Sequence, residues 1–369
     1  MNPSPALPFI DLSPGDDSPD IQAAIARVIE RGWFVLGPEV EGFEAEFASA
    51  SGVSFAVGVG NGTDAITLAL RALDIGPGDE VIVPAMTAAF TALAVIACGA
   101  RPRIVDVDAE TLTMDPAACA AAVTSRTRAV VPVHLYGQPA DMEAIRRVAD
   151  RHALAIVEDC CQAPLATENG VPVGTRSHFG AFSFYPTKNL GALGDAGALV
   201  TNDIALAARV RRLRNGGQRD RYHHEEPGVN SRLDEMQAAV LRVRLPRLPD
   251  WTARRRALAT LYREHMPEGV VPVRERDPGH VYHLFPVRVA ARDALGAHLA
   301  KTGIGTLIHY PVPLSAQAAF AAYQPPDCPV AACAAAELLS LPLHPRLEDA
   351  DVTRVTREIA LFRERRTTA

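Results

Sequence analysis

Lys188, Asp159 and Gln162 are the polar residues whose types and positions first suggest chemistry. Lys188 follows an apolar run and lies in a turn rich in proline and glycine, so its backbone is fixed while its long side chain can reach inward. Asp159 ends another apolar run, and Gln162 comes three residues later. Alone, a lysine in a loop is usually solvated and an aspartate after a strand usually caps a helix. Their meaning therefore depends on what surrounds them.

A third segment, residues 58–64, joins a short β-branched run to the helical stretch 65–73. Its small residues let backbone N–H groups and the Thr63 hydroxyl approach a phosphate at a helix N-terminus. The segment does not match the dinucleotide pattern G-x-G-x-x-G, because its third glycine comes one residue early. Hydride transfer is therefore a poor interpretation.

Together, the lysine, the aspartate followed by a glutamine, and the phosphate cradle meet the needs of pyridoxal phosphate. The aldehyde of this cofactor requires an amine, and its ring nitrogen requires an acidic partner. The residues therefore predict a pyridoxal-phosphate site.

The elements that must position these residues are short β-branched runs that alternate with Ala- and Leu-rich helical stretches. Alternation of this kind predicts a mainly parallel sheet covered on both faces, with ligands beyond the carboxyl ends of the strands. A helical lead-in segment, broken at Gly37-Pro38, precedes the first strand. The seven expected strands are residues 56–59, 81–83, 103–107, 129–134, 155–158, 181–185 and 198–201.

A change of pattern divides the chain near Pro246. A long helix is expected from residue 234 to 244 and beyond, and Pro246 and Pro249 must kink or break it. We expect an α/β fold with a large domain at 14–245, a small α+β domain at 246–369 and an N-terminal arm at 1–13. In the small domain we expect a strand at 283–289, a helix at 295–302, a strand at 306–309 and a final helix from about Asp349.

Composition excludes several classes of protein. The formal net charge is -6, which gives no electrostatic reason to expect a nucleic-acid partner. No segment resembles a signal peptide or a membrane span, so we expect a cytoplasmic protein without a membrane partner. The six cysteines show no metal-ligand spacing, and no metal is expected. The adjacent Cys160 and Cys161 could suggest redox chemistry, but burial as small packing residues is the preferred interpretation.

The order of motifs resembles the DegT/DnrJ/EryC1/StrS family of sugar aminotransferases, within the fold-type-I pyridoxal-phosphate enzymes. The resemblance covers nearly the whole chain and implies a seven-stranded sheet between helices. The matching segments are residues 60–65, 76–84, 105–108, 134–142, 158–163, 183–197, 230–237, 309–311 and 339–344. As a set they are highly specific, although none would be so alone.

The resemblance also implies roles for individual residues. Lys188 would form the Schiff base and act as general acid and base, while Asp159 would pair with the ring nitrogen. It also implies that Gln162 contacts the ring hydroxyl and that the phosphate is held by Thr63, Ser183 and the Gly62 backbone. Asn230 would contact the phosphate of the cofactor bound in a neighbouring subunit, which requires a homodimer. Where relatives often have a stacking aromatic residue this chain has Ala88, and Phe90 is the candidate to replace it. Candidate substrate contacts are His309, Tyr310 and Arg219.

The expected reaction moves an amino group from L-glutamate to a nucleotide-linked keto-sugar, with pyridoxamine phosphate formed on the way. A dTDP-linked 3-keto-6-deoxyhexose is the preferred acceptor. A nucleotide-linked 4-keto-sugar and a keto-cyclitol are the enzymatic alternatives, because the same catalytic residues serve all three. From another class, a pyridoxal-phosphate-binding regulator without catalysis is the alternative, although no basic stripe supports it.

Overall fold

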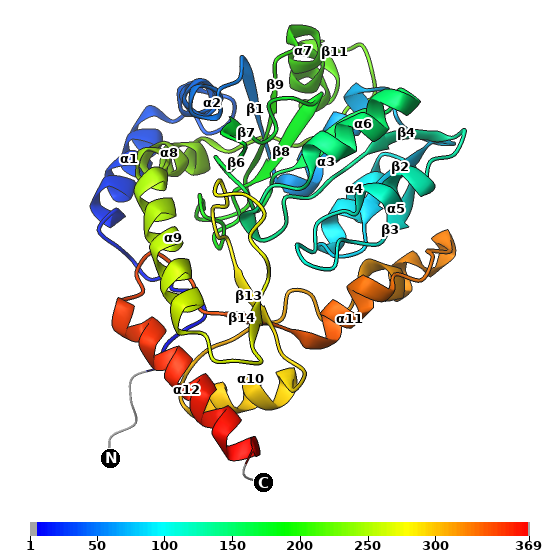
Figure 1. The fold of residues 1–369 in the computed structure, drawn as a ribbon. Helices are drawn as coiled ribbons and strands as arrows, with labels where there is room; N and C mark the ends of the chain where they lie inside the picture. Colours follow the sequence, from blue (N-terminus) through cyan, green and yellow to red (C-terminus); the bar gives the residue numbers. More distant parts are fainter. Residues whose placement is uncertain (1–5, 368–369) are drawn as a thin grey trace.

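The larger part of the molecule is built on a seven-stranded sheet (Figure 1). The computed structural model describes residues 6–367. The strand order is β1-β9-β8-β5-β4-β2-β3; β9 is antiparallel to both of its neighbours, and the other neighbouring pairs are parallel. The mainly parallel sheet that the sequence predicts is therefore confirmed. Its strands are β1 (Phe55–Val59), β2 (Glu80–Pro84), β3 (Arg101–Val105), β4 (Thr127–Val130), β5 (Ala155–Asp159), β8 (Phe179–Ser183) and β9 (Gly197–Thr201).

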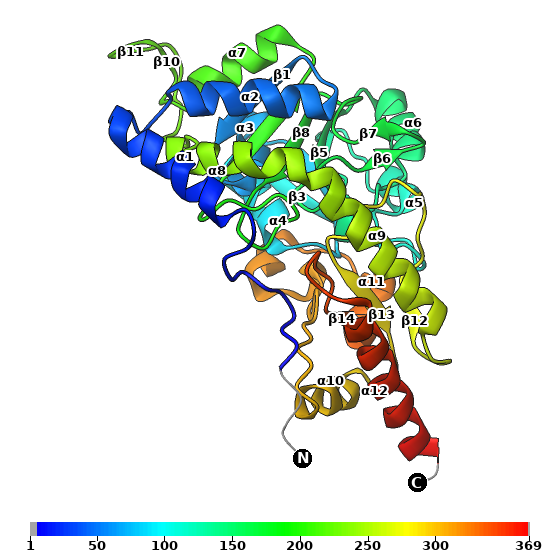
Figure 2. The ribbon, with the colours of Figure 1, turned by 90° about the vertical axis from the view of Figure 1, so that its left-hand side faces the viewer.

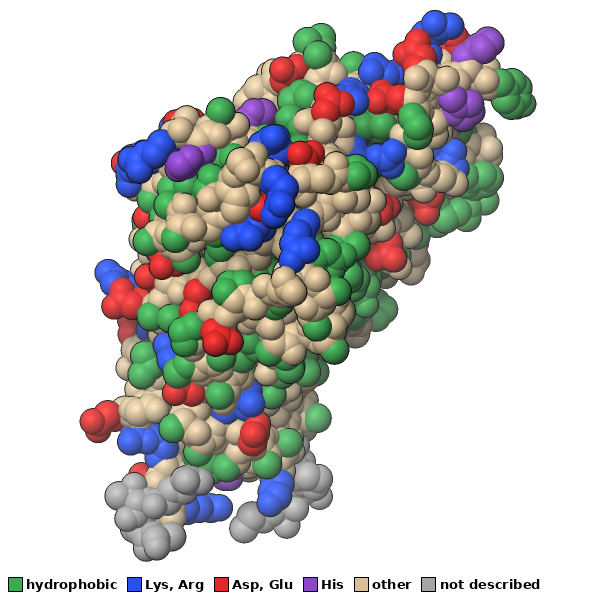
Figure 3. Space-filling view, turned by 90° about the vertical axis from the view of Figure 1, so that its right-hand side faces the viewer, with side chains coloured by type: hydrophobic (Ala, Val, Ile, Leu, Met, Phe, Trp, Pro, Cys, Tyr) green, Lys and Arg blue, Asp and Glu red, His purple; other side chains and the backbone are tan. Residues whose placement is uncertain are grey.

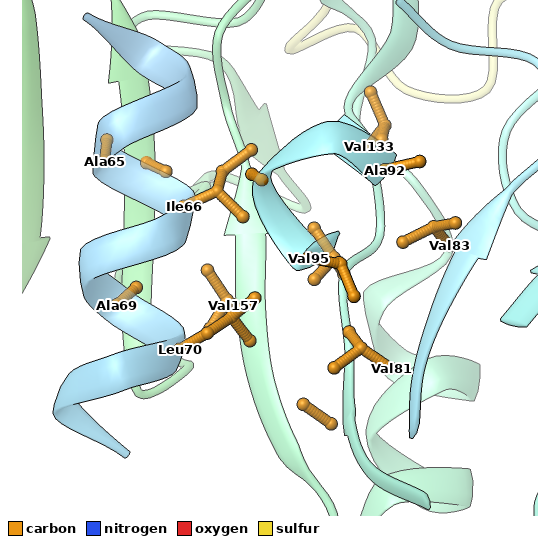
Figure 4. Packing of buried hydrophobic residues seen from close by; sticks show 14 of the residues in the cluster. Ala65, Ile66, Ala69, Leu70, Val81, Val83, Ala92, Val95, Val133 and Val157 are labelled. Carbon is orange, nitrogen blue, oxygen red and sulfur yellow. The ribbon is translucent and has the colours of Figure 1, made fainter. Parts of the chain in front are cut away.

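Helices cover both faces of this sheet because successive side chains of a buried strand point to opposite sides. On one face, Ile66 of α3 (Gly62–Ala72) and Val95 of α4 (Ala89–Ala97) share a core with Val157 of β5 (Figure 4). On the other face, Phe47 of α2 (Pro38–Ser51) meets Phe182 of β8 edge to face at 5.1 Å. The packing fixes α3 and α4 against the sheet, so their N-terminal residues are held in place.

The helical lead-in and the long helix have the breaks that the sequence predicts. The lead-in consists of α1 (Ser18–Arg31) and α2, and the long helix of α8 (Glu235–Arg244), a 3-10 turn η2 (Leu245–Arg247) and α9 (Leu248–His265). Glu235, which is fully buried, accepts backbone N–H groups from Gly37, Glu39 and Val40 and so caps α2. Figure 2 shows α9 running from the large sheet toward the smaller part of the molecule.

The smaller part contains an antiparallel sheet in the order β12 (Val271–Pro272), β13 (Phe285–Arg288), β14 (Leu338–Leu341). The helices α9, α10 (Arg292–Lys301) and α12 (Asp349–Thr367) share its core. The prediction of a strand at 306–309 is wrong: Leu307 forms one isolated bridge with Ser340. Pro311 and Pro313 follow and lack the N–H groups that a longer ladder needs.

The remaining elements are short or peripheral. No helix among residues 6–367 is long and apolar enough to cross a membrane. The remaining elements are α5 (Pro116–Ala121), η1 (Leu135–Gly137), α6 (Met142–His152), β6 (Thr167–Glu168), β7 (Val171–Pro172), α7 (Ile204–Leu213), β10 (Gln218–Asp220), β11 (His223–His224), η3 (Leu314–Ala316), η4 (Ala318–Tyr323) and α11 (Pro329–Glu337).

Candidate active site

Lys188 lies in a tight turn after β8, at the edge of the sheet where the parallel strands end. Its backbone N–H donates to the carbonyl of Tyr185 at 2.8 Å, and the side chain of Asn189 holds the turn through the carbonyl of Val281 at 2.9 Å. Among the described residues the Lys188 amine has neither a hydrogen-bond partner nor an ion-pair partner. Burial lowers its pKa, although Cys161 and Asp159 act in the opposite direction. The amine is thus a nucleophile and base on a half-buried side chain, without a partner among the described residues.

Asp159 ends β5, the strand next to β8, and its carboxylate is held at both oxygens. Thr91 donates its hydroxyl to Oδ2 at 2.8 Å, and the backbone N–H of Cys161 donates to Oδ1 at 3.1 Å. The hydroxyl of Thr87 lies 3.0 Å from that of Thr91 and so completes a chain of hydroxyl groups. Asp159 therefore does not cap a helix: it presents an oriented carboxylate that influences the pKa of Lys188.

The N-terminus of α3 meets the end of β8 beside these two residues. The Asn61 side chain caps the helix by accepting the N–H of Asp64 at 2.8 Å, which leaves the N–H groups of the first turn directed outward. A Cβ at Gly62 would lie 2.7 Å from Cys161 Sγ and 2.8 Å from Ser183 Cβ. Only glycine therefore allows this close approach, which brings Thr63 and Ser183 to the same helix terminus.

Gln162 is held by its amide group in a single orientation. Its Oε1 accepts the backbone N–H of Tyr136 at 2.6 Å, and its Nε2 donates to the hydroxyl of Tyr310 at 2.9 Å. The hydroxyl of Tyr136 donates to the carbonyl of His309. Gln162 and Tyr310, which the sequence assigned to separate roles, are therefore direct partners.

His309 is half-buried beside Tyr310, with Nδ1 3.0 Å from Ser340 Oγ and its ring stacked on Phe9 at 5.6 Å. Burial lowers its pKa to about 4, and the nearby Lys188 amine contributes to the shift. The N-terminal segment thus contributes a wall to the site through Phe9.

Three of the predicted site residues are exposed, although one of them, Phe90, precedes Thr91, which contacts Asp159. The ring of Phe90, in the first turn of α4, is 63% exposed. Asn230 is exposed next to Ser231, which accepts the N–H of Gly60 at 3.0 Å. Arg219 lies on the exposed β10–β11 hairpin, where its guanidinium donates to two acidic side chains, Asp220 and Glu225. Among residues 6–367, none of the three forms a hydrogen bond or an ion pair with Lys188 or Asp159.

Two features of the site were missed from the sequence. Thr91 contacts Asp159, and its signal was the pair of threonines at 87 and 91, one helical turn apart after β2. Behind β5, His134 Nε2 lies 2.8 Å from Glu158 Oε2 with both residues buried. Burial acts to raise the pKa of Glu158, but the hydrogen bonds that it accepts keep this pKa below its usual value.

The chemistry of these groups fits pyridoxal phosphate. The amine of half-buried Lys188, which has no partner among the described residues, suits the aldehyde, and an oriented carboxylate suits the ring nitrogen. A helix N-terminus beside a serine suits the phosphate. The face shown in Figure 3 carries both acidic and basic side chains.

Comparison with known proteins supports the same family. The chain is 50% identical to dTDP-3-amino-3,4,6-trideoxy-alpha-D-glucose transaminase of Streptomyces venezuelae, over 98% of this chain and 97% of the relative. The crystal structure of S. venezuelae DesV in complex with a ketimine intermediate superposes with a TM-score of 0.94 at 50% identity, covering 96% of this chain and 98% of that one. NtdA from Bacillus subtilis with bound PMP superposes with a TM-score of 0.90 at 31% identity, covering 98% and 85%.

A family model describes nearly the whole chain. It matches residues 16–360, a range that includes the seven-stranded and three-stranded sheets and every residue of the site around Lys188 except Phe9. The match covers the motifs on which the resemblance rested. The chain therefore belongs to the DegT/DnrJ/EryC1/StrS aminotransferase family.

Proposed function

We propose that this aminotransferase uses pyridoxal 5'-phosphate to move an amino group from L-glutamate to a nucleotide-linked keto-sugar, giving 2-oxoglutarate and an amino-sugar nucleotide. The observation that carries the proposal is the Lys188 amine, which has no partner among the described residues and lies near enough to the oriented carboxylate of Asp159 for that charge to act on its pKa. A structural lysine would instead be solvated or paired with an acid.

The cofactor is assigned to the residues that surround this pocket. Lys188 would hold its aldehyde carbon and Asp159 its ring nitrogen, with Gln162 on the side of the ring hydroxyl. The phosphate would be bound by the N–H groups at the start of α3, with the Gly62 backbone, Thr63 and Ser183. When bound, pyridoxal phosphate supplies an electron sink for the bonds at the α-carbon of the amino acid.

Lys188 supplies proton transfer in this scheme. Because burial lowers the pKa of the amine, a larger fraction of it is uncharged near neutral pH than for an exposed lysine. The uncharged amine can accept a proton from the α-carbon of glutamate and return it later. Asp159 keeps its orientation through Thr91 and the N–H of Cys161, so the carboxylate does not have to reorganise as charge moves.

A dTDP-linked 3-keto-6-deoxyhexose is the proposed acceptor. The support is the 50% identity to a transaminase named for a dTDP-3-amino sugar, over 98% of this chain. His309 lies near enough to Lys188 for that amine to help lower its pKa, and Tyr310 is the partner of Gln162; both are proposed to contact the sugar. Phe90 is proposed to stack on the cofactor ring.

We assign two further residues to a neighbouring subunit's site in a homodimer. Asn230 and Arg219 are exposed and stand apart from Lys188 of their own chain, which suits residues that act across an interface. Mixing Lys188→Ala and Asn230→Ala subunits tests this, because a hybrid dimer would contain one site with both substitutions and one site with neither. Recovered activity would support a shared site, whereas no recovery in proven hybrids would refute it.

The acceptor is tested with a panel of keto-sugar nucleotides and glutamate as the donor, scored by the mass of the aminated product. We expect amination of the dTDP-linked 3-keto-sugar. Preference for a 4-keto-sugar or a keto-cyclitol would refute the acceptor and keep the reaction. Cofactor binding without an absorbance change on adding glutamate would instead indicate the non-catalytic regulator.

The division of the chain is proposed to follow the break at η2. The large domain would comprise residues 14–245, and the small domain 246–369 with the arm 1–13. Separate cores around the two sheets support this division, although Phe320 and Ala331 pack with the core of the large sheet. Residues 1–5 and 368–369 lie outside the described part of the chain.

A further inference from the structure

We propose that the cavity between the N-terminal arm, α9 and the turn that carries Lys188 binds a carboxylate group of the amino donor through Arg255 and His344. The inference rests on the proposed function and deepens it, because it names the residues that recognise the donor. Neither residue belongs to the group around Lys188 and Asp159 described above.

The cavity has a volume of about 360 Å³, which is sufficient for a small ligand. Its lining includes residues 10–13 of the arm, residues 186–189 of the turn, Arg255 of α9 and residues 344–346, which follow β14. A smaller cavity of about 130 Å³ is lined by Arg255 as well, and also by His309. Arg255 therefore borders one cavity with Lys188 in its lining and a second with His309 in its lining.

Arg255 is a charged residue with an unused side. It is 5% exposed, and its Nη1 donates to the carbonyls of Leu343 at 2.7 Å and Tyr282 at 3.1 Å, which fixes the guanidinium. Its Nε is buried without an acceptor, and its Nη2 makes no hydrogen bond with any residue of 6–367. Burial lowers the pKa of Arg255 to about 10, so the group is still charged at neutral pH. A buried charge without a counter-ion is costly, which points to an anion supplied by a ligand.

The other arginines that line the larger cavity differ from Arg255 in this respect. Each of them pairs with an aspartate: Arg244 with Asp17 at 2.8 Å, Arg254 with Asp349 at 2.8 Å, and Arg346 with Asp11 at 3.1 Å. Asp16, also in the lining, pairs with Arg247 at 3.2 Å, and Asp250 is exposed. Within the described part of the chain, Arg255 forms no ion pair with any acidic residue.

His344 lies beside Arg255 and also lacks partners. It is 6% exposed, and both of its ring nitrogens are buried without a hydrogen bond to residues 6–367. Burial lowers the pKa of His344, and the charge of Arg255 acts in the same direction, so the imidazole is neutral at neutral pH. A neutral imidazole has one N–H to donate. Together the two side chains offer N–H groups to one anion.

The shape and the position of these groups favour a carboxylate of the donor. The planar guanidinium presents its N–H groups in a fork that matches a carboxylate. Burial lowers the pKa of His283 well below its usual value, and the positive charges of Lys188 and Arg255 add to this shift. The two cations thus lie near the same buried ring, and a five-carbon donor held at Arg255 is brought close to the Lys188 amine.

The test is a calorimetric titration of the purified holoprotein with glutarate, a five-carbon dicarboxylate that has no amino group and cannot react. His344→Phe should keep the fold, because His344 makes no hydrogen bond that would be lost, and should weaken glutarate binding about 10-fold or more, the scale of one hydrogen bond to a charged group. Arg254→Gln is the matched control, because it removes a paired arginine from the same lining. Its dissociation constant should stay within about threefold of the wild type, which is less than one hydrogen bond contributes.

Arg255→Lys keeps the inference testable if His344→Phe does not fold, and it should also weaken glutarate binding. Equal affinities of the wild type and either folded variant would overturn the inference, as would a wild type that does not bind glutarate. Inorganic phosphate that binds more tightly than glutarate, and depends on His344, would overturn the assignment to a carboxylate. A wild type that binds glutarate but does not transaminate glutamate would instead refute the proposed function, so the two failures are distinguishable.

Discussion

Replacing Thr91 with valine removes one hydroxyl while keeping the shape of a buried side chain. Thr91 is 1% exposed, and its proton goes to Asp159 Oδ2 at 2.8 Å. Because Thr91 donates its only hydroxyl proton to Asp159, its oxygen accepts the hydroxyl proton of Thr87 at 3.0 Å. The two threonines thus form a relay of hydrogen bonds that ends on the carboxylate. Thr91→Val breaks this relay at its last step.

The magnitude follows from the kind of hydrogen bond that is lost. A hydrogen bond to a charged group contributes about 1.5 to 3 kcal/mol. Each 1.36 kcal/mol in the barrier is a factor of ten, so the rate of the glutamate half-reaction should fall about 10- to 150-fold. Asp159 keeps the bond from the N–H of Cys161, which is why the loss should remain smaller than that of Asp159→Asn.

Stopped-flow absorbance after mixing the holoprotein with glutamate measures this rate directly. Thr91→Ser should restore most of it because serine keeps the hydroxyl. Thr356→Val, which removes a buried threonine hydroxyl in α12, is the matched control and should leave the rate unchanged. A Thr91→Val rate within threefold of the wild type, or Thr91→Ser as slow as Thr91→Val, would refute the role of the relay.

Three further outcomes are expected. Asp159→Asn should retain the fold and the cofactor but lose about 10²- to 10³-fold in turnover, which is the scale of breaking a buried charge pair. Turnover near that of the wild type, measured by the mass of the aminated product, would contradict this. Gly62→Ala should weaken cofactor binding about 10-fold or more in a fluorescence titration, because the Cβ of the alanine would lie 2.7 Å from Cys161 Sγ. An unchanged dissociation constant would show that the N-terminus of α3 is not the phosphate site. The rate at which the apoprotein couples added pyridoxal phosphate should rise with pH. The midpoint of this rise should lie below about 10.4, the ordinary lysine pKa, because burial lowers the pKa of Lys188. A midpoint at the ordinary value would argue against this effect of burial.

The sequence predicted the large sheet well because its strands are buried on both faces. Runs such as 81–83 and 155–157 are continuously apolar or β-branched, which is the pattern of parallel strands between two layers of helices. The prediction of a strand at 306–309 was wrong because the local sequence pattern does not show how many residues of an apolar run pair with a neighbouring strand. Leu307 pairs once with Ser340, and Pro311 then prevents the ladder from continuing.

In the candidate site, the sequence singled out polar residues at or shortly after the ends of strands but not the residues that support them. Lys188 and Asp159 stand out because a polar residue after an apolar run is costly without a purpose. Thr91 contacts Asp159 from a separate helix, and a long-range contact of this kind leaves only the weak signal of two threonines one turn apart. The bond between Gln162 and Tyr310 joins residues 148 positions apart and is not visible in local spacing.

Covalent trapping tests the central claim, that the Lys188 amine is the group that holds pyridoxal phosphate. Purified holoprotein is reduced with borohydride, digested, and searched by mass spectrometry for the peptide that carries the reduced cofactor. We predict a single modified peptide that contains Lys188, and no modification in Lys188→Ala. A modified peptide without Lys188, or no trapped cofactor in a protein that transaminates, would contradict the account.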